Sequence, residues 1–159
     1  MSEEPLASLA PIGWVRCARD PEEEDDWGAV PARIELAPEF GPEALAGLEE
    51  FSHVQVLFLL HAVDPERVET GRRHPRNNPA WPAVGIFAQR VKRRPNRLAS
   101  TICTLERVDG ATLHVRGLDA IDGSPVLDLK PVMAEFLPRG PVRQPTWATE
   151  LMAAYWRRH

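Results

Sequence analysis

The chain has 159 residues, enough for one domain, because a chain of this length buries roughly two-thirds of its unfolded surface around a single core. Sixteen prolines and ten glycines favour short strands joined by turns over long helices. The sequence contains neither an apolar run of about 18 residues nor a basic and apolar N-terminal signal, so we expect a soluble cytoplasmic protein without a membrane span.

The net charge of −4 argues only weakly against a polyanionic partner, because the charges are segregated along the chain. Residues 1–50 carry 13 acidic and 3 basic side chains, whereas residues 70–105 carry eight basic side chains and no acidic one. A basic stretch in an otherwise acidic protein is typical of a local phosphate-binding surface.

Two strands are expected near the N-terminus, on either side of an acidic loop. Residues 12–17 and 32–37 alternate apolar and polar side chains, as strands with one buried face do. Residues 20–26 contain six acids and predict a mobile loop. Residues 43–51 place apolar side chains at helical intervals and predict one short amphipathic helix.

The centre of the chain combines a core strand with a long loop. Residues 53–61 are interrupted only by Gln55 and predict a strand buried on both faces or nearly so. Residues 64–83 are rich in Pro, Arg and Asn and predict a long loop, a length that is often functional in a compact domain. Residues 84–91 then predict another strand.

Two hairpins are expected in the second half. Residues 100–108 and 111–117 flank Asp109-Gly110, a pair that favours a type I′ turn. Residues 118–121 and 125–130 enclose a similar turn. Short antiparallel strands at this spacing predict a mainly β fold, either a barrel or a sandwich.

The C-terminal part returns to helical spacing. Residues 147–158 carry aromatic and aliphatic side chains on one stripe, which predicts a terminal helix that docks on the rest of the protein.

The segment GIFAQRVKRRPNR, residues 85–97, carries the densest cluster of cations. Arginine offers five donors in a planar fork that matches phosphate and carboxylate groups. A solvated charge run is the alternative interpretation. Trp81 in the preceding loop could stack on a base, although a tryptophan between prolines is more often a packing anchor.

Asp128 and Lys130 lie two apart in a predicted strand and therefore share one face. Together they could hold a polar cofactor, and the alternative is a surface ion pair. His74 lies among arginines, where a neutral imidazole could stack on a base or accept a proton, or have a structural role only. His53 and His61 lie roughly 25 Å apart in an extended strand and cannot share a metal ion.

Other cofactor signatures are missing from the sequence. Cys17 and Cys103 are solitary, which favours buried free thiols and gives no zinc site. No Gly-rich dinucleotide or phosphate-binding fingerprint is present, which disfavours a doubly wound methyltransferase.

Four ordered motifs resemble one family, the TsaA-like β-barrel tRNA methyltransferases. The motifs are GLEEFSHVQVLFLLH at residues 47–61, HPR at 74–76, GIFAQR followed by RRPN within 85–96, and LDAIDGSPVLDLKP at 118–131. The resemblance spans residues 10–138. It implies a single small antiparallel β-barrel with short peripheral helices and a homodimer whose interface helps to build the cofactor site. It also implies transfer of a methyl group from S-adenosylmethionine to N6 of threonylcarbamoyladenosine beside the anticodon of threonine tRNA.

The resemblance also implies roles for individual residues. The cofactor pocket would draw on Phe87, Ala88, Arg90, Arg94, Asn96, Asp128 and Lys130. The RNA-binding residues, taken from the basic stretch, would be Arg72, Arg73, Arg76, Lys92, Arg93 and Arg97. The general base is not assigned, and His74 and Asp128 are the two candidates.

The chain departs from the family pattern in its richest motif, with Gln89, Val91 and Arg97 where the family has Thr, Ser and Pro. These changes put cofactor affinity and substrate choice in question. Two alternatives therefore stay open: a cofactor-binding barrel acting on another small substrate, and a non-catalytic RNA-binding module. We expect a flexible N-terminus at residues 1–10, the barrel domain at 11–138, and an extension with a short helix at 139–159.

Overall fold

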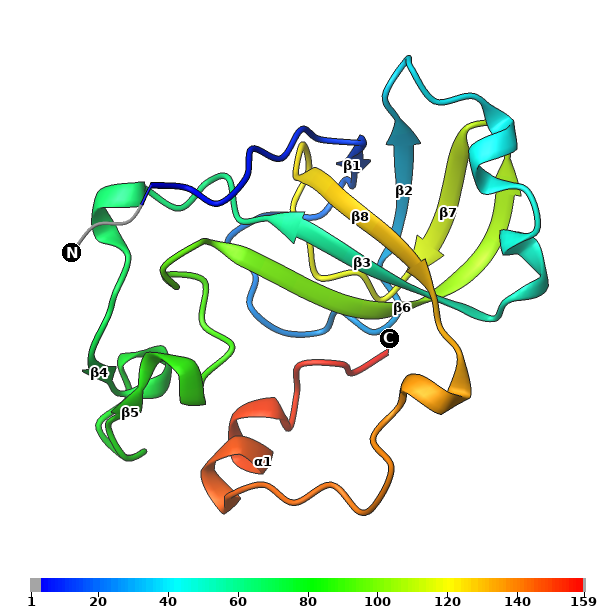
Figure 1. The fold of residues 1–159 in the computed structure, drawn as a ribbon. Helices are drawn as coiled ribbons and strands as arrows, with labels where there is room; N and C mark the ends of the chain where they lie inside the picture. Colours follow the sequence, from blue (N-terminus) through cyan, green and yellow to red (C-terminus); the bar gives the residue numbers. More distant parts are fainter. Residues whose placement is uncertain (1–3, 159) are drawn as a thin grey trace.

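Six antiparallel strands form a closed barrel in the computed structural model, which describes residues 4–158 (Figure 1). The strand order is β1-β2-β7-β6-β3-β8, and pairing of β8 with β1 closes the barrel. The bounds are β1 Gly13–Arg16, β2 Pro31–Leu36, β3 His53–Leu59, β6 Leu98–Asp109, β7 Thr112–Arg116 and β8 Pro125–Pro131. The expected mainly β barrel is confirmed.

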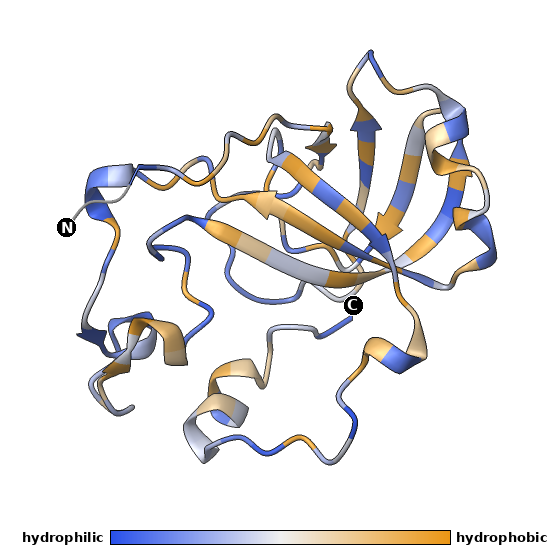
Figure 2. Ribbon diagram, viewed as in Figure 1, coloured by the Kyte–Doolittle hydropathy of each residue, from blue (hydrophilic) through white to orange (hydrophobic). Residues whose placement is uncertain are grey.

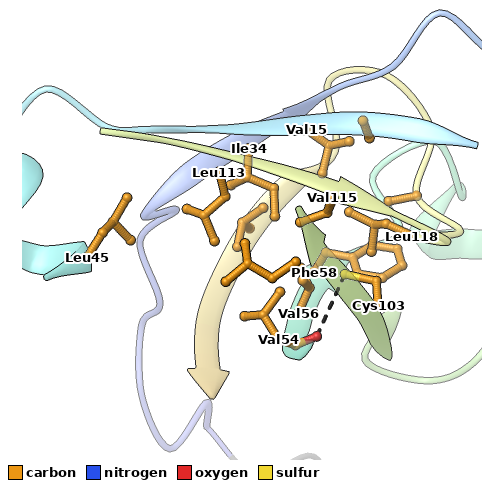
Figure 3. Close-up of a cluster of buried hydrophobic side chains, with 14 residues drawn as sticks. Val15, Ile34, Leu45, Val54, Val56, Phe58, Cys103, Leu113, Val115 and Leu118 are labelled. Atoms are coloured by element: carbon orange, nitrogen blue, oxygen red, sulfur yellow. Dashed lines mark hydrogen bonds between the residues drawn. The ribbon is translucent and has the colours of Figure 1, made fainter. Parts of the chain in front are cut away.

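The barrel interior is the hydrophobic core, and all six barrel strands contribute buried side chains to it. Hydrophobic and hydrophilic residues alternate along β2 and β8 (Figure 2). On β3, Val54, Val56 and Phe58 are buried inside, next to side chains from β2, β6 and β7 (Figure 3). Gln55 and Leu57 face outward and are half-exposed. The prediction that this strand is buried on both faces or nearly so is correct for the inner face only, because a barrel wall has its core on the inner side and the outer side chains are only partly buried.

The two cysteines are free, as expected. Cys103 is buried, and its thiol donates to the carbonyl of Val54 at 3.7 Å. Burial raises the pKa of Cys103 to about 12, and the charge of Asp119 acts in the same direction. Cys17 is half-buried on the chain that leaves β1.

The hairpin between β6 and β7 forms, but its turn differs from the expected type. Asp109 pairs with Thr112, so Gly110 and Ala111 occupy the turn. Only Gly110 has a positive φ, of 61°, whereas a type I′ turn requires a positive φ at both central residues. The turn therefore has the pattern of type II′, with glycine first.

The second expected hairpin does not form. Residues 118–121 contain no strand, and β8 pairs with β1 and β3. Leu118 and Ala120 are fully buried in the core cluster, so this segment closes one end of the barrel while it carries the chain to β8. The Asp122-Gly123 turn itself forms, with Gly123 at a φ of 78° and the Ser124 N–H donating to the Ile121 carbonyl, but Leu118 and Ala120 are buried in the core without strand pairing.

Helices are short. The helix expected at residues 43–51 is two 3₁₀ segments, η1 Pro42–Leu45 and η2 Leu48–Glu50, separated by Gly47 with a φ of 88°. Within residues 4–158, the single α-helix is α1, Thr146–Met152, which ends earlier than the expected terminal helix. No helix in the described part of the chain is long and apolar enough to cross a membrane.

The loop after β3 folds outside the barrel. It contains η3 Pro65–Arg67, β4 Arg72–Arg73 and η4 Pro75–Asn77, followed by β5 Val84–Gly85 and η5 Ile86–Ala88. The strand expected at residues 84–91 is therefore only two residues long, because the chain turns into η5 to bury Ile86. A last 3₁₀ segment, η6 Ala134–Phe136, follows β8. The expected flexible N-terminus begins outside the described residues, and residues 4–10 are exposed without helix or strand.

Candidate functional site

The outer wall formed by β6, β3 and β8 is the centre of the candidate site. The strand register aligns Ser100, Leu57 and Asp128 in one row across the three strands. The next row consists of Ile102, Gln55 and Lys130. Both rows face outward, because their neighbours along β3 point into the core. Asp128 and Lys130 therefore share this wall, as their spacing predicted.

Asp128 and Lys130 form an exposed ion pair on this wall. Lys130 Nζ lies 2.9 Å from Asp128 Oδ2, and the other carboxylate oxygen accepts from the backbone N–H of Leu129 at 2.9 Å. About half of each side chain is exposed, so the pair contributes at most about 1 kcal/mol to stability. It can therefore rearrange around a ligand that carries both charges.

Arg90 reaches the same sheet from the loop region. Its Nη2 donates to the backbone carbonyl of Ser100 on β6 at 2.7 Å. β6 pairs with β7 only from Thr104 onward. At Ser100, therefore, β6 has a neighbouring barrel strand on one side only, which is β3. Ser100 and Asp128 are two strands apart, roughly 10 Å at the usual strand spacing. Arg90 is thus bonded to the backbone of β6, and the Asp128–Lys130 pair lies on β8, on the other side of β3.

The segment before Arg90 is fastened by Gln89. This side chain is buried, and its amide Nε2 donates to the carbonyls of Arg73 at 2.9 Å and Val84 at 3.0 Å. It therefore joins β4 to β5. Phe87, in contrast, is 77% exposed, with Ala88 exposed beside it.

Two of the arginines in this region bond to the backbone around them. Arg94 Nη1 donates to the carbonyls of Gln89 at 2.8 Å and Val91 at 3.5 Å. Arg97 has a φ of 50°, and its Nη1 donates to the carbonyl of Val63 at 3.0 Å. Both guanidinium groups shape the turn that returns the chain to β6. Asn96, at the tip of this turn, is exposed.

The loop between β3 and β6, residues 60–97, is called the basic loop below. It contains two further arginines with carboxylate partners. Arg73 is largely buried and donates to Glu69 at 2.9 Å and to Asn77 at 3.0 Å. Arg76 meets the carboxylate of Asp25 at 2.8 Å, and this hydrogen bond raises the pKa of Arg76. The acidic loop thus packs on the basic loop.

The remaining cations of the predicted RNA-binding set are accessible. Arg72 and Lys92 are exposed. Arg93 lies 4.0 Å from Glu69 with nearly half of its side chain exposed. Phosphate groups can reach these three side chains without breaking a short internal ion pair.

The imidazole of His74 is oriented by a backbone carbonyl. Its Nδ1 lies 2.6 Å from the carbonyl oxygen of Trp81, which can only accept, so Nδ1 carries the proton. Nε2 then has a lone pair and can accept a proton. Among residues 4–158 no group of three or more His, Cys, Asp or Glu side chains could hold a metal ion.

Comparison with known proteins identifies the fold family. Residues 16–136 match the family model of the tRNA-methyltransferase O N-terminal domain, which is more than half of the chain. The chain belongs to this family. Within it, the chain resembles TrmO from Pseudomonas aeruginosa, a crystal structure that superposes with a TM-score of 0.67 at 32% identity, over 86% of this chain and 61% of that one.

Curated relatives of this tRNA-methyltransferase O family chain are longer. A tRNA (adenine(37)-N6)-methyltransferase of Mus musculus is 42% identical over 93 residues, which is 58% of this chain and 21% of the relative. A putative S-adenosylmethionine-dependent methyltransferase, RcsF, of Pseudomonas aeruginosa is 36% identical over 130 residues, which is 78% of this chain and 54% of the relative. The chain thus spans between a fifth and about half of these proteins.

One hydrogen-bonded cluster of this family member was not predicted. Asp119, in the segment that closes the barrel end, accepts hydrogen bonds from Thr101 and from Tyr155. Burial raises the pKa of Tyr155, and the neighbouring Asp119 carboxylate adds to the effect. The LDAIDG motif contains Asp119, but nothing in the sequence indicated its partners, because they lie 18 and 36 residues away.

An apolar groove of about 490 Å³ lies elsewhere, between β8 and the 3₁₀ segments η1 and η2. Its lining includes Phe40, Leu45, Leu48 and Leu129, with Glu50 as the one charged side chain. It lacks the paired charges of the β6–β3–β8 wall and suits a charged cofactor poorly.

Proposed function

We propose that this protein transfers a methyl group from S-adenosylmethionine to N6 of adenosine 37 in tRNA, and that the substrate is threonylcarbamoyladenosine in a threonine-accepting tRNA. One observation carries the proposal: Arg90 is bonded to β6 and the Asp128–Lys130 pair lies on β8, on either side of β3, in a barrel that belongs to the tRNA-methyltransferase O N-terminal domain family. The name of the mouse relative supports methylation of N6 of adenosine 37 in tRNA, and the name of the Pseudomonas relative supports S-adenosylmethionine as the methyl donor.

The side chains on this wall fit the groups of the methyl donor. S-adenosylmethionine carries a carboxylate, an ammonium group, two ribose hydroxyls and an adenine ring. Arg90 and Lys130 would bind the carboxylate, Asp128 would accept from the ammonium group or the hydroxyls, and the exposed ring of Phe87 would cover the adenine. When bound, the cofactor supplies an activated methyl group on its sulfonium, so the protein contributes mainly orientation.

The substrate nitrogen must lose a proton during transfer, and His74 is the favoured acceptor. Its Nε2 has a lone pair because Nδ1 donates to Trp81. Asp128 is the less suitable candidate, because Lys130 and the Leu129 N–H already occupy its carboxylate.

RNA binding would rest on the three accessible cations, Arg72, Lys92 and Arg93. Arg73, Arg76 and Arg97 would act indirectly, because their ion pairs and hydrogen bonds hold the shape of the basic loop. Binding through phosphates predicts a strong dependence on salt concentration.

A homodimer that covers the site is part of the proposal. Leu98 and Ile102 on the outer side of β6 are 41% and 45% exposed. A second copy on this wall would bury them and enclose the cofactor. Size-exclusion chromatography with light scattering tests whether the protein is a dimer. A monomeric mass at every protein concentration tested, including those well above the concentration used in the activity assay, would contradict the proposed homodimer.

The two alternative functions were suggested by residues that depart from the family pattern, and the structure gives two of these residues a role in the fold. Gln89 and Arg97, which depart from the family pattern, both bond to the backbone of the basic loop and are compatible with its fold. A cofactor-binding barrel with another substrate, or a plain RNA-binding module, remains distinguishable by experiment.

Incubation with threonylcarbamoylated tRNA and methyl-labelled S-adenosylmethionine tests the proposal. We expect label in the modified adenosine, and loss of label with Arg90→Gln but not with Arg33→Gln, which removes an exposed arginine on β2. Tight cofactor binding without labelled tRNA would favour another substrate. Binding of tRNA without cofactor affinity would reduce the protein to an RNA-binding module.

A further inference from the structure

The C-terminal segment, residues 146–158, lies outside the part of the chain that matches the family model. After β8 the chain runs outside the barrel, through η6 and α1, and then returns toward the barrel at the C-terminus (Figure 1). Hydrogen bonds connect this segment to three elements of the candidate site.

The first connection is to the barrel wall. The hydroxyl of Tyr155 donates to Asp119, which also accepts from Thr101 on β6. Thr101 follows Ser100, whose carbonyl holds Arg90. The C-terminal segment is thus anchored at the point of β6 where Arg90 is bound.

The second connection is to the basic loop. Trp81 Nε1 donates to the carboxylate of Glu150 on α1 at 2.8 Å. The backbone carbonyl of the same Trp81 accepts from His74 at 2.6 Å. Glu150 therefore holds the residue that orients the His74 imidazole.

The third connection is to the acidic loop. The backbone N–H groups of Asp26 and Trp27 donate to the carbonyls of Ala154 and Tyr155 at 3.0 and 2.8 Å. The preceding residue, Asp25, holds Arg76. The charges of Arg76 and Arg90 also both act on the Tyr155 hydroxyl, which lies between the loop and the wall.

We propose that Glu150 and Tyr155 are positioning residues, and that residues 146–158 brace the loop carrying His74 and Arg76 against the barrel beside Arg90. The brace fixes the place of the substrate nucleotide relative to the methyl donor. Asp128 and Lys130 lie on the barrel and Arg90 is bonded to Ser100 of β6, so displacement of the loop that carries His74 weakens cofactor binding less than it weakens turnover of tRNA. Only the expected change in kcat/KM for tRNA rests on the proposed function.

The test uses the full chain with Glu150→Ala, Glu150→Gln and Tyr155→Phe. The glutamine amide oxygen still accepts from Trp81, so Glu150→Gln rescues the contact that Glu150→Ala removes. Glu135→Ala is the matched control, an exposed acid on η6. We expect Glu150→Ala and Tyr155→Phe to lower kcat/KM for tRNA by about three- to tenfold, the effect of one lost hydrogen bond, and to change the Kd for S-adenosylmethionine by a smaller factor.

Hydrogen exchange of residues 72–83 supplies a second measurement that needs no activity. Exchange accelerates in Glu150→Ala and Tyr155→Phe and stays at the wild-type rate in Glu150→Gln and Glu135→Ala. Wild-type kinetics and exchange in Glu150→Ala would overturn the proposal, as would an equal loss of cofactor affinity and tRNA turnover. If the wild-type chain methylates no tRNA, the proposed function fails, and the exchange rates alone decide whether the brace exists.

Discussion

Replacing Asp128 by Asn separates a functional role from a structural one. The substitution keeps the side-chain shape and removes the charge that pairs with Lys130 at 2.9 Å. Because the pair is exposed, its loss costs at most about 1 kcal/mol of unfolding free energy, equivalent to roughly 2–4 °C in Tm for a chain of this size. A cofactor ammonium or hydroxyl bound to the carboxylate loses a charged hydrogen bond worth about 1.5–3 kcal/mol, which is roughly 10- to 150-fold in Kd.

Calorimetric titration with S-adenosylmethionine and a thermal melt measure both effects on one sample. Glu106→Gln is the matched control, because Glu106 forms an exposed ion pair with Arg116 on the outer surface of β6 and β7. We expect Asp128→Asn to weaken cofactor binding at least tenfold with little change in Tm, and Glu106→Gln to leave binding unchanged. A Kd within twofold of wild type in Asp128→Asn would refute the assignment of Asp128 to the cofactor site.

Three further predictions follow from particular contacts. Gln89→Leu leaves the carbonyls of Arg73 and Val84 without their side-chain donor, so we expect local stability to fall by about 1–3 kcal/mol. Hydrogen exchange in β4 and β5 should become faster. An unchanged exchange rate would contradict the role of Gln89. The Cys103 pKa is raised from 9.0 to about 12, so the unfolded state loses its thiol proton first as pH rises. The free energy of unfolding should therefore fall between pH 9 and about 12, and Cys103→Ala should flatten this part of the pH profile; an equally steep profile in the variant would argue against it. Combined Arg72→Ala, Lys92→Ala and Arg93→Ala should reduce the slope of log K for tRNA against log salt by about 2–3, and a slope equal to wild type would exclude these residues from phosphate contact.

The strands that could be predicted are those whose side-chain alternation reflects one buried face. Leu113 and Val115 on β7 are fully buried and alternate with polar residues, and this strand lies where the pattern indicates. Reading burial from apolar side chains fails for the outer face of β3, because outer residues such as Leu57 are apolar without being part of the core. Residues 118–121 show the converse, since the turn that follows them forms as predicted, but Leu118 and Ala120 are buried in the core without strand pairing.

The candidate site could be predicted in part. The shared face of Asp128 and Lys130 follows from strand geometry alone, whereas the position of Arg90 beside Ser100 depends on a loop that no local pattern specifies. The internal hydrogen bonds of Arg73, Arg94 and Arg97 could not be predicted either, because a run of cations in the sequence does not indicate which side chains bond within the protein and which stay free for a ligand. The brace from Tyr155 and Glu150 depends on contacts 36 and 69 residues distant in sequence.

The central claim is that the methyl donor binds on the outer wall of β6, β3 and β8. A crystal structure of the protein with S-adenosylmethionine measures this directly. We predict that the cofactor contacts Arg90, Asp128 and Lys130. A cofactor bound away from these three side chains, for example in the apolar groove beside Phe40 and Leu48, would contradict the account.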